Sequence, residues 1–136
     1  MIDKEIIKIA SNTDNHGTLD NHTHFSKLKN SICGDDMKIY LIVENNKITN
    51  FKYECESCIY CQASVSLLSR KAKNILIEKV KNFAQQANSY FDKNTNSFDK
   101  EWKEFDKIMT KNNIQRKECL LLPINTMLDA LNKKSL

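Results

Sequence analysis

Two strand-like runs on either side of Asn45 and Asn46 are the strongest constraint on how this chain can fold. The runs cover residues 37–43 and 48–55, and both are rich in β-branched and aromatic side chains. Asparagine tolerates the positive φ angles of a tight turn, so the two runs are predicted to pair as an antiparallel hairpin. Residues 23–29 are predicted to add a third strand.

After the hairpin, apolar side chains recur at helical spacing in four segments. They are residues 62–73, 76–91, 102–109 and 124–131. Pro123 is expected in the first turn of the last helix, where a missing N–H has no cost. A small antiparallel sheet of about three strands packed with about four α-helices is an α+β fold. The 136 residues are enough for one domain, residues 1–136, and the segment 1–20 is expected to be mobile or helical.

The charge and hydropathy patterns argue against nucleic-acid and membrane partners. The chain has 21 basic and 17 acidic residues, and its lysines are interspersed with Asp and Glu rather than gathered in a stripe. No apolar run approaches the roughly 20 residues that span a bilayer, and residues 1–5 are too charged for a signal peptide core. We therefore expect a cytoplasmic protein. We also expect a monomer or a weak dimer.

Five cysteines carry the chemical information in this chain. One precedes Gly34 and Asp35, three are spaced two residues apart, and one lies far downstream. They are Cys33, Cys55, Cys58, Cys61 and Cys119. In a reducing compartment, an odd number of cysteines at such spacing indicates metal or sulfur chemistry rather than a disulfide framework.

The hairpin predicts which of these residues meet. Neighbouring strands lie about 5 Å apart, so the loop before the first strand and the turn after the second meet at one end of the sheet. Cys33, Asp35 and Cys58 can therefore share one metal ion. Cys58 is expected at a helix N-terminus, where the thiolate is favoured. Cys119, expected just ahead of the last helix, is a further candidate ligand, although a buried cysteine can also be a small core residue.

Three motifs resemble the signatures of the U-type iron–sulfur scaffold proteins, namely IscU, SufU and the N-terminal domain of NifU. The motifs are NSICGD at residues 30–35, CIYCQASVS at 58–66 and RKEC at 116–119. The resemblance implies a SufE/NifU-like fold, with Cys33, Asp35, Cys58 and Cys119 as ligands of an iron–sulfur cluster, in first place [2Fe-2S], or of Zn²⁺. It also implies a scaffold rather than an enzyme. Such a scaffold receives iron, takes sulfur from a cysteine desulfurase, and passes the cluster to acceptor apo-proteins.

Several residues depart from the family pattern. Ser31 stands where the family commonly has Pro, and Cys55 and Ser57 stand where it has glycines around the second Cys. Glu118 replaces the histidine of IscU-type proteins. The missing histidine favours the SufU-like branch, and the chain is expected to be nearest to SufU-like or short NifU-like members.

Three alternatives remain open at this point. The same four ligands could hold zinc in a protein that accepts sulfur from a desulfurase. Cys55, Cys58 and Cys61 match the opening of a ferredoxin motif, which would suit an electron carrier or sensor, but the chain after Cys61 does not continue that motif. The protein could also be a metal-free interaction module. In the scaffold interpretation, Cys55 and Cys61 are extra thiols that relay sulfur or simply half-buried residues.

Overall fold

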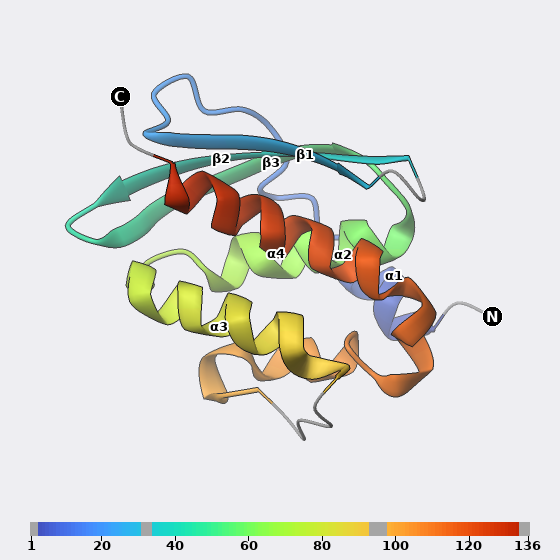
Figure 1. The fold of residues 1–136 in the computed structure, drawn as a ribbon. Coiled ribbons are helices and arrows are strands. Elements are labelled where there is room, and N and C mark those ends of the chain that lie inside the picture. Colours follow the sequence, from blue (N-terminus) through green and yellow to red (C-terminus); the bar gives the residue numbers. More distant parts are fainter. Residues whose placement is uncertain (1–2, 31–33, 93–97, 134–136) are drawn as a thin grey trace.

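The computed structural model describes residues 3–30, 34–92 and 98–133. Its sheet has three antiparallel strands in the order β1-β2-β3, with bounds His24–Asn30, Asp35–Glu44 and Lys47–Glu56. The helices pack on one side of this sheet, and α4 and α2 form the layer next to it (Figure 1). The predicted α+β class and the predicted third strand are both confirmed.

The hairpin forms as the sequence predicts. Glu44 pairs with Lys47, and the two residues between them have the positive φ angles of a tight turn, 53° for Asn45 and 63° for Asn46. Along β2, alternate side chains are buried and face the helices, in keeping with the two-residue period of a strand. The strands thus present one apolar face to the helical layer.

Six helical segments surround this face within the described ranges. They are α1 (Lys4–Ala10), α2 (Ile59–Lys71), α3 (Ile77–Tyr90), the 3-10 helices η1 (Lys100–Lys107) and η2 (Lys111–Arg116), and α4 (Lys117–Asn132). The segment 1–20 therefore contains a helix. The prediction of an α-helix over 102–109 is wrong, because η1 is a 3-10 helix. Trp102 and Phe105 lie three residues apart, which matches the 3-10 period, and both pack on Phe83, with ring centroids 4.2 and 4.8 Å away.

The start of the last helix also differs from the prediction. α4 begins at Lys117, so Pro123 lies inside the helix and Cys119 lies in its first turn rather than ahead of it. Pro123 has no N–H to donate to the carbonyl of Cys119, four residues earlier. The rule that places proline in a first turn failed because this proline is buried, and packing of the apolar residues before it extends the helix.

Polar contacts fix α4 against its neighbours at both ends. Near its end, the carboxylate of Asp129 accepts a hydrogen bond from Ser26 of β1. Near its start, the hydroxyl of Ser64 in α2 donates to the carbonyl oxygen of Leu120 at 2.6 Å, and both residues are fully buried. The N-terminal turns of α2 and α4 are therefore held side by side.

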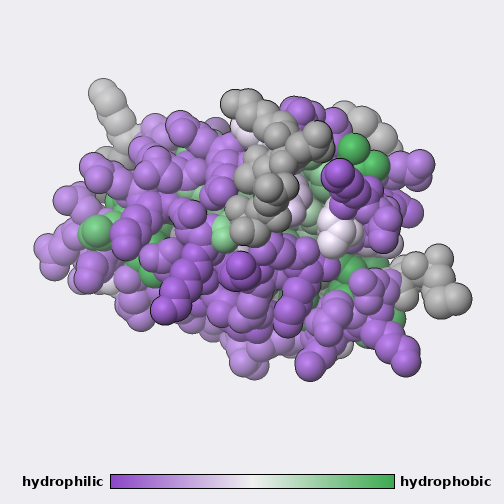
Figure 2. Space-filling model, turned by 90° about the horizontal axis from the view of Figure 1, so that it is seen from below, coloured by the Kyte–Doolittle hydropathy of each residue, from purple (hydrophilic) through white to green (hydrophobic). Residues whose placement is uncertain are grey.

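The molecular surface is largely hydrophilic on the face shown in Figure 2, with hydrophobic side chains in small separate areas. This agrees with the interspersed lysine and carboxylate pattern of the sequence. None of the helices in the described ranges combines the length and the apolar character needed to cross a membrane.

Candidate metal centre

Asp35, Cys58 and Cys119 come together at one end of the sheet. Asp35 is the first residue of β2, Cys58 is the N-cap of α2, and Cys119 lies in the first turn of α4. One ligand atom from each lies within 4.8 Å of the other two. Among residues 3–30, 34–92 and 98–133, this is the one group of three or more Cys, His, Asp or Glu side chains placed to share a metal ion. Three separate elements thus bring together three of the four predicted ligands, and their role in binding a metal stays a prediction.

The carboxylate of Asp35 has one oxygen engaged and one available. Its Oδ1 accepts a hydrogen bond from the backbone N–H of Cys58 at 3.1 Å, which caps the start of α2, where Cys58 makes no side-chain cap of its own. Its Oδ2 is buried and has no hydrogen-bond partner among the described residues. A buried carboxylate oxygen without a partner is costly, so this atom is suited to bind a cation.

Cys119 is almost completely enclosed, with 1% of its surface exposed, whereas Cys58 is partly exposed. The amide of Asn30 in β1 lies beside the Cys119 sulfur, with an Nδ2 to Sγ distance of 4.0 Å. Asn30 begins the NSICGD motif, but no pattern in the sequence marks it as a functional residue. Both thiols lie at helix starts, where backbone N–H groups favour a negative charge.

A cation–π contact joins the starts of the two helices that carry these thiols. The guanidinium carbon of Arg116 lies 5.3 Å from the ring centroid of Tyr60. Arg116 is the N-cap of α4, and Tyr60 lies in the first turn of α2. Such a contact between the exposed Arg116 and the half-buried Tyr60 contributes about 0.5–1 kcal/mol.

Cys33 lies outside the described residues, so its predicted role as a ligand stays a prediction. Gly34 immediately precedes β2, at the end of the connection from β1. The Gly34 N–H donates to the carbonyl of Asn30 at 2.7 Å, and its φ of 73° suits glycine. Asn30 pairs with Asp35 across the two strands, so both residues face the same end of the helical layer.

Cys55 and Cys61 have different surroundings from the metal group. Cys61 is fully buried in the core, and burial raises the pKa of its thiol. Burial also raises the pKa of the partly exposed Cys55 thiol. Cys55, Cys58 and Cys61 are free thiols.

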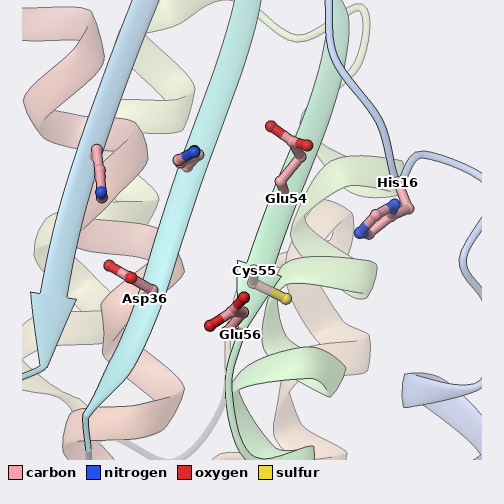
Figure 3. A pocket seen from close by; sticks show the side chains of 7 residues that line it. His16, Asp36, Glu54, Cys55 and Glu56 are labelled. Carbon is pink, nitrogen blue, oxygen red and sulfur yellow. The ribbon is translucent and has the colours of Figure 1, made fainter.

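Cys55 opens onto a cavity of about 310 Å³ that the sequence did not predict. Figure 3 shows the carboxylates of Asp36, Glu54 and Glu56 around it, while the sulfur of Cys55 points toward the side of β3 on which His16 lies. His16 is brought there by a backbone bridge to Tyr53. Cys61 faces the core, and Cys58 lies beside Asp35 of β2 and Cys119 of α4. The geometry therefore favours a site formed by Asp35, Cys58 and Cys119 over a ferredoxin-like site formed by Cys55, Cys58 and Cys61.

Comparisons with known proteins identify relatives of this chain. The family model described as NifU-like N terminal domain matches residues 1–93. A protein of Thermotoga maritima named iron-sulfur cluster assembly scaffold protein IscU is 28% identical over 137 residues, covering 99% of this chain and 95% of its own. An uncharacterized protein of Borreliella burgdorferi is 31% identical over 131 residues, covering 96% of this chain and 82% of its own.

Two solved structures share the fold. The N-terminal NifU-like protein of Brucella abortus superposes with a TM-score of 0.88 at 18% identity, covering 95% of this chain and 90% of its own. The putative scaffold protein for the SUF system of Fervidobacterium islandicum also gives a TM-score of 0.88, at 22% identity, covering 96% of each chain. The family resemblance inferred from the three motifs is confirmed. Since the family model spans well over half of its residues, this chain belongs to the family of NifU-like N-terminal domains.

Proposed function

We propose that the protein is an iron–sulfur cluster assembly scaffold in which Asp35, Cys58, Cys119 and Cys33 bind the growing cluster. The observation that carries the proposal is the meeting of Asp35, Cys58 and Cys119 from three elements, with a buried carboxylate oxygen left unpartnered in the described part of the chain. Cys33 is two residues from Asp35, so the chain cannot separate their Cα atoms by more than about 7 Å. The name of the Thermotoga maritima relative supports the same function.

The thiolate and carboxylate ligands suit a protein that assembles a cluster and then releases it. Iron in clusters prefers thiolate sulfur, and a carboxylate in place of a fourth thiolate leaves one iron more weakly held. Asp35 is therefore the expected point of release. In this function a cysteine desulfurase supplies sulfur, and the finished cluster, [2Fe-2S] with four ligands, passes to acceptor apo-proteins.

A second candidate function is a zinc-bound sulfur acceptor, and the compactness of the site favours it. In a tetrahedral zinc site, metal–ligand bonds of about 2.0–2.3 Å place the ligand atoms about 3.3–3.8 Å apart. The three described ligand atoms, all within 4.8 Å, come close to this spacing. A two-iron cluster needs wider spacing between ligands of different irons, so binding a cluster would require the three side chains to move apart.

Metal analysis of protein purified without oxygen tests the two functions. Iron with about equal acid-labile sulfide, and visible absorption, is the result expected for a scaffold. About one zinc per chain without sulfide would indicate a sulfur acceptor instead of a scaffold.

Alanine variants of each candidate ligand test the site itself. We expect Cys33→Ala, Cys58→Ala and Cys119→Ala to lose the cluster, whereas the matched variants Cys55→Ala and Cys61→Ala keep it. A need for Cys55 or Cys61 together with a dispensable Cys119 would contradict the assignment.

Asp35→Ala tests the release step. Because it removes the most weakly bound ligand, the variant should keep a thiolate-held cluster and transfer it to an apo-ferredoxin more slowly than the wild type does. Faster transfer would count against a release role for Asp35.

A further inference from the structure

Asn30 occupies a buried position where a strand usually places an apolar side chain. In β1 the alternate residues Ser26, Leu28 and Asn30 lie on the more buried face, which packs against α4, and Asn30 is only 9% exposed. A buried amide is retained where it makes hydrogen bonds. One of these runs from Asn30 Nδ2 to the sulfur of Cys119.

The Cys119 sulfur needs such a donor when it becomes a ligand. Only the thiolate binds metal, and Cys119 is 1% exposed, so water cannot stabilise its charge. The start of α4 supplies part of the compensation. A neutral thiol is a weak acceptor, which fits the long distance of 4.0 Å, whereas a thiolate would attract the amide more strongly.

We propose that Asn30 is a positioning residue for metal binding. Its amide donates a hydrogen bond to the metal-bound Cys119 sulfur and holds that sulfur toward Asp35 and Cys58. The inference rests on the proposed function, because it requires Cys119 to be a ligand. Partners of this kind, one shell outside the metal ligands, typically change metal affinity by about 10–100-fold. Hydrogen bonds to ligand sulfur also reduce the electron density that the sulfur gives to the metal.

Ser26 provides a matched control on the same strand face. It also ties β1 to α4 through a hydrogen bond, to Asp129, but at the opposite end of the helix from Cys119. The test compares Asn30→Leu, which keeps the branched shape and removes the donor, with Ser26→Ala. Asn30→Ala serves as a second variant that cannot overpack the site, and thermal unfolding with chelator present monitors the fold of each.

Two measurements follow, zinc affinity by chelator competition and the thiolate-to-metal charge-transfer band at saturating Co²⁺. We expect both Asn30 variants to bind zinc at least about 10-fold more weakly and to shift the band to longer wavelength. We expect Ser26→Ala to match the wild type in both measurements, even if it unfolds at a lower temperature. A purely structural role of Asn30 would lower stability without moving the band of the saturated site.

Unchanged affinity and an unchanged band in the Asn30 variants would overturn the positioning role. Cys119→Ala separates this failure from failure of the proposed function. If Cys119→Ala loses zinc while the Asn30 variants keep it, only the role of Asn30 is refuted. If Cys119→Ala keeps zinc, the ligand assignment is refuted, and the role of Asn30 with it.

Discussion

Replacing Asp35 with Asn should stabilise the metal-free protein and weaken its response to zinc. The carboxylate has one oxygen that caps α2 through the Cys58 N–H and one buried oxygen without a partner among the described residues. Asparagine keeps a carbonyl oxygen for the cap. It also replaces the unpartnered anionic oxygen with an amide N–H, which can donate to neighbouring sulfur.

The two effects can be estimated separately. A buried polar atom without a hydrogen bond costs about 1–3 kcal/mol, so we expect metal-free Asp35→Asn to gain about 1–2 kcal/mol. For a chain of this size, that gain corresponds to a rise in Tm of roughly 3–8 °C. With zinc at about 100 times its Kd, the wild type gains about 2.7 kcal/mol, whereas a variant that binds tenfold more weakly gains about 1.4 kcal/mol.

Thermal and urea unfolding, each with chelator and with a fixed excess of zinc, measure both effects. Asp36→Asn is the matched control, because Asp36 is adjacent in β2 but faces the opposite side of the sheet, near Lys29. Its zinc-induced gain should equal that of the wild type. A metal-free Asp35→Asn protein that melts below the wild type, or one with an undiminished zinc response, would refute this account of the carboxylate.

Further predictions concern stability and thiol reactivity. Ser64→Ala should lower the free energy of unfolding by about 1–2 kcal/mol, because it removes the buried hydrogen bond to Leu120. The control Ser89→Ala, whose hydrogen bond in α3 is exposed, should be neutral or slightly stabilising. Urea unfolding measures the stability of both variants. Iodoacetamide and mass spectrometry should find Cys55 modified in the native protein and Cys61 only after unfolding, so early labelling of Cys61 would contradict its burial. Because burial raises the pKa of the Cys61 thiol in the folded state, the unfolded chain loses this proton first, and stability should fall as pH rises above 9.0; Cys61→Ala should reduce that slope.

Local rules were sufficient for the sheet and for part of the site. The Asn45 and Asn46 turn, the alternation along β2 and β3, and the placement of Cys58 at a helix start depend on residues close together in the chain. The meeting of Asp35 and Cys58 follows from the hairpin register alone. Features of this kind need no knowledge of how distant elements pack.

Residues that act across elements were not predictable from spacing. Asn30 looks like an ordinary strand terminus until β1 is packed under α4, which brings its amide to Cys119, 89 positions away. His16 lies beside Cys55 only because the segment after α1 returns to bridge Tyr53. Both cases depend on long-range packing, for which the sequence carries no periodic signal.

The start of α4 shows how packing can override a local rule and also shape the site. If the helix began at Pro123, the sulfur of Cys119 would belong to a preceding loop, with no helix N-terminus to favour its thiolate. The helix instead begins at Lys117, so Cys119 is its third residue. Pro123 has no N–H, so the carbonyl of Cys119 lacks an α-helical donor. The next carbonyl, that of Leu120, is bound by Ser64 of the helix that begins beside Cys58. The backbone next to Cys119 is therefore held by α2, the helix whose N-cap is Cys58. Metal binding and the packing of α2 on α4 should depend on each other.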